Sequence, residues 1–329
     1  MSIINTATHH LWTGTRYWSF KFASYLSSKV PLRFGYLVGT VLGDIGYLFW
    51  KRHSANAVSN MRRVMGEHAE WSLVKEVARD SFRNYFKTLV DFARYPHLTQ
   101  NEISKSITAH SGWDNLNKAL ERKKGVLAIS GHIGNWDMAG ALLGSHGMPV
   151  YAVADTFKPK KIDDLINGAR ERAGVKIIKL ETGSLRQIFT ALKHNEIVML
   201  LVDKPEPEEG VAVQFFGETA YVPGGPAAIA IKTGASLMFG YCTRRRGDKT
   251  FEGVLEPIEY EHLLTGDKEK DIQIVTQQIM SSMEEVVRRF PDQWYMFRQM
   301  WPRTAHHDAA IKRRRFLGGG KRDVKAVSG

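Results

Sequence analysis

From about residue 113 onward, apolar runs of strand length alternate with stretches that have helical periodicity. Short apolar runs bounded by polar residues or glycine are typical of buried strands, and apolar residues repeating every three or four positions indicate helices. The predicted strands are 126–129, 149–154, 175–180 and 197–202, and the helices between them are 135–145, 159–173 and 184–194. This alternation predicts an α/β fold with a mainly parallel or mixed central sheet flanked by helices.

The pattern changes after residue 202, where shorter runs and turn residues become frequent. The elements predicted there are strands 211–216 and 218–222 around Gly217, a helix 227–232, a hairpin of 237–245 with 251–259, and a long helix 267–290. Arg244–Arg246 stands at the predicted hairpin turn. It either contacts phosphates of a ligand or forms a solvated hairpin tip.

The first 60 residues are rich in aromatic side chains at spacings of three to five. The apolar run after Pro31 is interrupted by Asp44 and four glycines and ends at Lys51-Arg52. Its uninterrupted stretch is shorter than the roughly 20 residues of a spanning helix. Aromatic residues at headgroup level with Lys and Arg on anionic lipid fit an amphipathic segment in the membrane interface. A pair of core-packed helices and a full membrane span stay open as alternatives.

Residues 54–95 predict two further helices. Their apolar stripe, which we expect in the core, consists of Trp71, Leu73, Val77, Phe82, Tyr85, Phe86 and Leu89. The chain thus divides into a helical, membrane-associating region (1–110), an α/β core (111–302) and a basic tail (303–329). We expect the tail to be disordered, because it combines a charge run with three consecutive glycines.

Composition narrows the possible partners. A chain of 329 residues with a net charge of +12 can bury a large core and attract anionic membrane surfaces or phosphate-rich ligands. The sequence carries no helix-turn-helix, RNP-type strand or zinc-finger pattern, so we expect no nucleic-acid partner. The single cysteine, Cys242, excludes a disulfide framework and a cysteine-rich zinc site, and we predict no metal site.

Candidate chemistry gathers at the end of the predicted strand 126–129, in the segment Gly131-His-Ile-Gly-Asn-Trp-Asp137. A histidine with an acid five positions later is uninformative alone, because His97 and His262 share that spacing. Only His132 follows an apolar strand and stands beside a glycine. Ligands of open α/β sheets bind at the carboxyl ends of strands, where Asp203 also follows a predicted strand.

We expect Asn135 to cap the next helix and Asp137 to lie in its first turn, where the helix dipole favours a carboxylate. From there Asp137 could reach back to His132, orient the imidazole and leave its other nitrogen free as a base. The alternative is a capping motif with an incidental histidine. The sequence has no G-x-S-x-G elbow, Walker A loop or complete dinucleotide fingerprint. Direct activation of a hydroxyl is therefore favoured over covalent catalysis.

Residues 131–137 resemble the HX4(D/E) motif of glycerolipid-type acyltransferases. Their HxGNW form is most similar to the branch of lipid A late acyltransferases and phosphatidylinositol mannoside acyltransferases, and Asp at position 137 is closer to the mannoside enzymes. The resemblance covers roughly residues 30–302. Its further blocks are Arg170–Gly174, Val202-Asp203, Phe215–Gly217, Pro223–Ala227, Thr233–Ala235 and Pro291–Trp294.

This resemblance implies an O-acyltransferase at the cytoplasmic face of the inner membrane. The enzyme would move a fatty acyl chain from acyl-CoA or acyl-carrier protein to a hydroxyl of a glycolipid, without a cofactor. His132 would be the general base and Asp137 the acid that orients it, and backbone N–H groups at the helix start could hold the oxyanion. The implied substrate-binding residues are Arg170, Asp203, Gly134, Asn135 and Gly225.

Two other functions remain compatible with the same residues. The His–Asp pair could activate water and give a thioesterase or lipase-type hydrolase. Alternatively, the protein could bind a membrane surface without catalysis, in which case His132 is structural.

Overall fold

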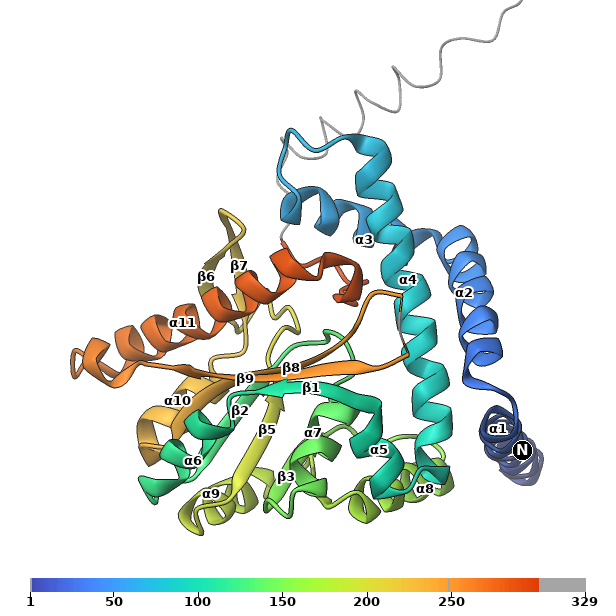
Figure 1. Ribbon diagram of the computed structural model, residues 1–329, viewed down its shortest axis with the longest axis horizontal. Helices are drawn as coiled ribbons and strands as arrows, with labels where there is room; N and C mark the ends of the chain where they lie inside the picture. Colours follow the sequence, from blue (N-terminus) through green and yellow to red (C-terminus); the bar gives the residue numbers. More distant parts are fainter. Residues whose placement is uncertain (1, 248, 302–329) are drawn as a thin grey trace, which may run out of the picture.

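The computed structural model describes residues 2–247 and 249–301, with side chains from residue 15 onward except that of residue 16. The predicted tail, 303–329, lies outside these ranges. A seven-stranded sheet forms the centre, in the order β1-β9-β8-β2-β5-β3-β4 (Figure 1). The strands are β1 (Ile107–Ser111), β2 (Val126–Ser130), β3 (Val150–Ala154), β4 (Val175–Lys179), β5 (Ile197–Leu201), β8 (Ser236–Arg244) and β9 (Phe251–Ile258).

The sheet is mixed, with a parallel centre. Strands β8, β2, β5, β3 and β4 run parallel, whereas β9 is antiparallel to β8 and parallel to β1. This confirms the predicted fold class. The hydrophobic pattern does not predict β1, because only Ile107 of its five residues is buried. An edge strand of this kind has no apolar run to mark it.

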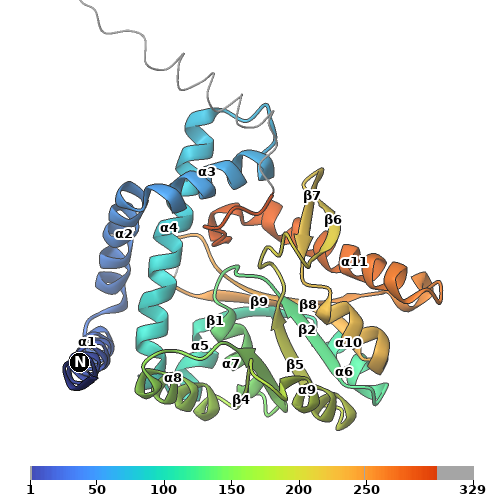
Figure 2. The same ribbon diagram turned by 180° about the vertical axis from the view of Figure 1, so that it is seen from behind.

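Helices cover both faces of the sheet (Figures 1 and 2). Those packed on one face are α6 (Trp113–Glu121), α7 (Trp136–Ser145) and α8 (Lys160–Arg172). Those on the other face are α9 (Ser184–Lys193), α10 (Gly225–Thr233) and α11 (Lys268–Arg289). A separate hairpin, β6 (Val211–Phe215) with β7 (Glu218–Val222), packs on α11. The main core lies between the sheet and α11.

Five α-helices precede β1 in the described residues. Helix α4 is the one against which the first three pack. The five are α1 (Ser2–Lys29), α2 (Leu32–Phe49), α3 (Lys51–Val64), α4 (Trp71–Arg94) and α5 (Gln100–Ser106). Helices α1, α2 and α3 all pack against α4 (Figure 1). The predicted stripe of α4 is only partly correct: Phe82 is buried, but Leu73 and Leu89 are 46% and 38% exposed. Polar Ser81, Thr88 and Asp91 are buried instead.

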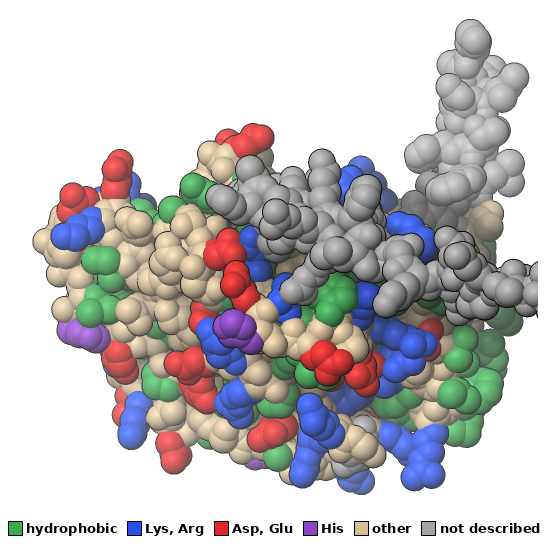
Figure 3. All heavy atoms as spheres, turned by 90° about the horizontal axis from the view of Figure 1, so that it is seen from above, with side chains coloured by type: hydrophobic (Ala, Val, Ile, Leu, Met, Phe, Trp, Pro, Cys, Tyr) green, Lys and Arg blue, Asp and Glu red, His purple; other side chains and the backbone are tan. Residues whose placement is uncertain are grey.

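Helix α2 has two contrasting faces. Its buried face consists of four glycines and Tyr36, and a Cβ at Gly43 would lie 2.6 Å from the Cα of Arg83 on α4. Hydrophobic side chains gather at the α1–α2 end of the molecule (Figure 3). The exposed apolar residues of α2 and the next position are Phe34, Leu37, Val38, Val41, Leu42, Ile45, Leu48, Phe49 and Trp50.

The glycines explain how α2 packs on α4 and still exposes an apolar face. The packing on α4 agrees with the alternative of core-packed helices, and contact of the exposed face with a membrane stays a prediction. Among the described helices, none is long and apolar enough to cross a membrane.

The glycine contact gives a prediction about stability. Alanine at an ordinary helix position stabilises by up to about 1 kcal/mol relative to glycine, and Gly168 of α8 has only the flexible end of Arg172 near its Cβ position. We expect Gly168→Ala to raise the free energy of unfolding and Gly43→Ala to lower it, because the backbone of α4 would have to move. Denaturant titration of both variants measures the difference. Equal and positive changes would contradict close packing of α2.

Candidate active site

His132 and Asp203 meet because β2 and β5 are neighbours that end at the same edge of the sheet. Ser130 and Leu201, the last residues of the two strands, are paired in register. His132 and Asp203 each follow two residues later. The carboxyl ends of parallel strands form the usual ligand site of such sheets.

A hydrogen-bonded pair joins the two side chains. Nδ1 of His132 lies 2.7 Å from Oδ1 of Asp203, and the backbone N–H of His132 donates to Oδ2 at 2.9 Å. A third donor, the indole N–H of Trp294, reaches Oδ2 at 3.0 Å. A carboxylate only accepts, so Nδ1 carries the hydrogen and Nε2 is left as a base. Asp203 is fully buried, whereas the His132 side chain is 40% exposed.

This pairing sets the protonation of both groups. Burial lowers the pKa of His132, but the charge and hydrogen bond of Asp203 raise it more, so its pKa lies above the ordinary 6.5. Burial raises the pKa of Asp203, but the charge of His132 and the three hydrogen bonds outweigh it, so its pKa lies below the ordinary value. The imidazole is thus a stronger base than a free histidine.

The expected contact between Asp137 and His132 is wrong. Asp137 is the second residue of α7 and accepts a hydrogen bond at 2.7 Å from Nε of Arg170 on α8. Both side chains are largely buried, at 11% and 9% exposure. A permanently charged guanidinium from the neighbouring helix therefore holds this carboxylate. Asp203 takes the position that the sequence assigned to Asp137.

Gly134 and Asn135 shape the turn between β2 and α7, which we call the catalytic turn (residues 131–135). Gly134 has φ +60°, and a Cβ there would lie 2.2 Å from the carbonyl oxygen of Cys242. Its N–H donates to the Gln293 carbonyl at 2.9 Å, and that of Asn135 to the Cys242 carbonyl at 2.7 Å. These two amides already have acceptors in the protein, so an oxyanion would need other donors.

The remaining sequence-based candidates lie in different places. The Asn135 side chain accepts from the Met138 N–H at 3.1 Å, so it caps α7 as expected. Gly225 is the first residue of α10, and the space where its side chain would be is open. Arg244 is buried at 9% exposure, so it is not part of a solvated hairpin tip. Within the described ranges, no three His, Cys, Asp or Glu side chains form a candidate metal site.

The C-terminal segment supplies site residues to which the sequence assigned no role. Besides the Trp294 indole, the Tyr295 N–H donates to the His132 carbonyl at 2.8 Å. Trp136 lies edge-on to the imidazole, with ring centroids 5.3 Å apart. The Pro291–Trp294 block of the resemblance indicated this segment, but nothing in its pattern shows that the indole meets Asp203.

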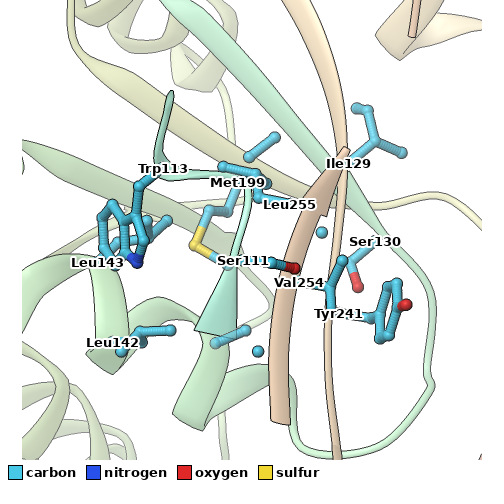
Figure 4. A pocket seen from close by; sticks show the side chains of 15 residues that line it. Ser111, Trp113, Ile129, Ser130, Leu142, Leu143, Met199, Tyr241, Val254 and Leu255 are labelled. Atoms are coloured by element: carbon cyan, nitrogen blue, oxygen red, sulfur yellow. The ribbon is translucent and has the colours of Figure 1, made fainter. Parts of the chain in front are cut away.

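A narrow apolar pocket with a cavity volume of about 40 Å³ lies between the sheet and α7. Ser130 of β2 and Tyr241 stand on one side of it, and Trp113 and Leu143 on the other (Figure 4). Gly240 and Gly253 are part of the sheet wall, and the side chains of Leu255 and Leu142 pack closely against them. Ser130, which lines the pocket, is two residues before His132 in the sequence.

Comparison with known proteins identifies the family. The model of the bacterial lipid A biosynthesis acyltransferases matches residues 4–303. The chain belongs to this family. It is 28% identical over 247 residues to a phosphatidylinositol mannoside acyltransferase of Mycolicibacterium smegmatis, covering 74% of this chain and 77% of the relative. A Mycobacterium tuberculosis protein of the same name is 26% identical over 264 residues, with 78% and 81% coverage.

The chain is also similar to the lipid A biosynthesis palmitoleoyltransferase of Escherichia coli. The two are 24% identical over 288 residues, which is 84% of this chain and 92% of the relative. The names of both kinds of relative refer to glycolipids, and the matches cover 74–84% of this chain. The suggested resemblance to this family is therefore confirmed.

The pairing of His132 predicts a change that can be measured without substrate. Replacing Asp203 by Asn removes the negative charge that raises the imidazole pKa, so we expect the pKa of His132 to fall. Asp137→Asn is the matched control, because that charge is balanced by Arg170. NMR titration of the histidine side chains measures both. An equal fall in the two variants would contradict the assignment of Asp203 as the partner.

Proposed function

We propose that this protein is an O-acyltransferase that moves a fatty acyl chain from acyl-CoA or acyl-carrier protein to a hydroxyl of a membrane glycolipid. Phosphatidylinositol mannosides and lipid A precursors are the acceptor classes, as the names of its relatives suggest. The observation that carries the proposal is the His132–Asp203 pair at the carboxyl end of the sheet, with Nε2 left as a base. We place the reaction at the cytoplasmic face of the inner membrane.

In the proposed reaction Nε2 of His132 takes the proton of the acceptor hydroxyl. The hydroxyl oxygen then attacks the thioester carbonyl carbon, and the carbonyl becomes a tetrahedral oxyanion. When the oxyanion collapses, the C–S bond breaks, the ester forms and the thiolate takes the proton from the imidazolium. Asp203 stabilises the charged imidazolium and keeps Nδ1 protonated. We assign Arg170, which Asp137 holds, to the substrate site as a positive charge for an anionic group.

The apolar pocket suits the acyl chain of the donor. It is lined almost entirely by carbon and lies on the α7 face of the sheet, next to the strand that leads to His132. A chain in it would be shielded from water, which favours binding by roughly 25 cal/mol for each Å² of apolar surface buried. Trp113 lies on the side away from Ser130 (Figure 4) and would limit chain length.

The exposed face of α2 suits contact with the lipid surface in which the acceptor resides. Contiguous exposed apolar surfaces are typical of sites that contact proteins or membranes. Directly after the apolar residues come the exposed cations Lys51 and Arg52 at the start of α3. This order of apolar and cationic side chains fits the interface of an anionic bilayer.

His132→Ala should lower acyl transfer by about 10²- to 10⁴-fold, the usual contribution of a general base. The assay uses palmitoyl-CoA or palmitoyl-acyl-carrier protein with vesicles that contain a phosphatidylinositol mannoside or a lipid A precursor, and mass spectrometry identifies the product. Vesicle binding should be unchanged, because α2 is the proposed contact surface. The free energy of unfolding should fall, because Asp203 loses one of its hydrogen-bond partners, so turnover is compared per folded molecule.

Three outcomes would contradict the proposal. Free fatty acid as the main product in the presence of acceptor would favour a hydrolase. Normal turnover by the His132→Ala variant, or vesicle binding by the wild type without donor consumption, would exclude His132 as the base of an acyl transfer.

A second prediction concerns membrane contact. Leu37→Glu should weaken binding to anionic vesicles by roughly tenfold or more, because burying a leucine side chain is worth about 1.5–3 kcal/mol. Leu185→Glu on α9 is the matched control, since Leu185 and Leu37 are 57% and 60% exposed. Vesicle sedimentation compares the two proteins. If both variants bind as the wild type does, α2 is not the contact surface.

A third prediction concerns acyl length. Trp113→Ala should shift the preferred donor to longer chains, because it removes the side chain that bounds the pocket. His146→Ala is the control: its ring lies 4.5 Å from that of Trp113 but does not line the pocket. A panel of acyl-CoA donors measures the preference. An unchanged preference in Trp113→Ala would place the acyl chain elsewhere.

A further inference from the structure

A buried polar cluster lies between α2, α4 and the catalytic turn. It consists of Tyr36 on α2, Asp91 on α4, Arg244 at the end of β8, and Asn135. Nη2 of Arg244 lies 2.6 Å from Oδ2 of Asp91, and the Tyr36 hydroxyl donates to Oδ1 of Asp91 at 2.7 Å. Arg244 also donates to the Tyr36 hydroxyl, and the Asn135 side-chain amide donates to Oδ2 of Asp91 at 3.3 Å.

All four residues are at least nine-tenths buried, with exposures of 8%, 4%, 9% and 3% in the order given. The free energy lost when an ion pair is removed from water is about as large as the electrostatic attraction between its charges. A buried ion pair therefore contributes little net stability. What a satisfied buried network does supply is a fixed geometry, since each charge needs its partners in place.

The cluster reaches the catalytic turn by two routes. The first is Asn135, which donates to Asp91 while its side-chain oxygen caps α7. The second is Gln293, whose side chain bonds both the N–H and the carbonyl of Arg244, at 2.8 and 2.9 Å. The Gln293 carbonyl in turn accepts the N–H of Gly134. The two residues that follow Ile133 are thus held on both sides by groups bound to Asp91 or Arg244.

The same cluster reaches the exposed helix. Tyr36 is the one non-glycine residue on the buried face of α2 within the described structure. It is flanked by Gly35 and Gly39, which hold α2 close to α4. The opposite face of α2 is the apolar surface. A shift of α2 against α4 would therefore change the bond between Tyr36 and Asp91.

We propose that Asp91 and Arg244 are positioning residues for the catalytic turn, and that Tyr36 makes this positioning depend on how α2 is seated. The inference rests on the proposed function, because it assigns α2 to the lipid surface. When α2 lies on the bilayer, the Tyr36–Asp91 bond holds the Asp91–Arg244 pair, and that pair holds Asn135 and Gly134 behind His132. Neither Asp91 nor Arg244 contacts the reacting atoms in this scheme.

The test compares two variants with two matched controls in the palmitoyl-CoA and glycolipid-vesicle assay described above. Asp91→Asn keeps the shape of the side chain but removes its charge. Tyr36→Phe removes one hydroxyl. Asp271→Asn is the control for the acid, since Asp271 is also 4% exposed, and Tyr260→Phe is the control for the hydroxyl, since Tyr260 is buried and bonded to two carbonyls.

We expect Asp91→Asn to lower kcat by about 10- to 100-fold per folded molecule with KM for palmitoyl-CoA unchanged, because small misplacements of reacting groups have effects of this size. Tyr36→Phe should lower kcat on vesicles severalfold while vesicle binding stays normal. The two controls should lower Tm without changing kcat. If the four variants lose activity only in proportion to their unfolded fraction, the cluster is merely structural.

Hydrogen exchange gives a readout that does not need turnover. The N–H groups of Gly134 and Asn135 should exchange faster in Asp91→Asn than in the wild type, and at the wild-type rate in Asp271→Asn. Unchanged exchange in Asp91→Asn would overturn the inference even if acyl transfer is confirmed. A wild type that transfers no acyl chain would overturn the proposed function, while the exchange rates would still decide the positioning role.

Discussion

The site depends on a fully buried carboxylate, that of Asp203. Asp203 accepts three hydrogen bonds, from the backbone and the imidazole of His132 and from the indole of Trp294. A buried carboxylate without such partners is strongly unfavourable. The turn after β2 and the C-terminal segment must therefore both be in place whenever Asp203 is charged. The same bonds that satisfy the carboxylate orient His132 and raise its pKa.

Two acids near the catalytic turn thus have separate tasks. Asp203 serves the imidazole, and Asp137 serves Arg170 and joins α7 to α8. A third acid, Asp91, lies behind the turn and bonds groups from α2, β8 and the turn itself. The residues that would touch lipid and the residue that would take the proton are therefore parts of one connected structure. This connection joins the N-terminal helices to the catalytic turn of the α/β core.

Local patterns in the sequence predict most of the sheet, because buried strands such as 126–130 and 197–201 are continuous apolar runs. They also predict the place of the site, since His132 and Asp203 both follow such strands. They do not predict which acid meets the imidazole. That depends on β2 and β5 being neighbours, and strand order is a long-range property. Motif spacing favoured Asp137, which is close in sequence but turned toward α8.

The sequence does not predict the buried cluster of Tyr36, Asp91, Arg244 and Asn135, for a related reason. Asp91 has a helical spacing from Ser81 and Thr88 on the buried face of α4, but a polar residue at such a position is read as solvent-facing when its partners are unknown. Arg244 is likewise indistinguishable from its exposed neighbours in the Arg-Arg-Arg run until β8 is placed beside α4. The family relationship indicates the reaction class, whereas these contacts show which residues can support it.

The pH dependence of kcat/KM for acyl transfer is the most direct test of the His132–Asp203 pair. The base must be neutral to accept a proton, so the rate should rise with pH through the pKa of His132 in the free enzyme, above 6.5. In Asp203→Asn the pKa of His132 falls, and the rise should move to lower pH while the plateau rate decreases. A rise that stays at the same pH in Asp203→Asn would contradict His132 as the base that Asp203 holds.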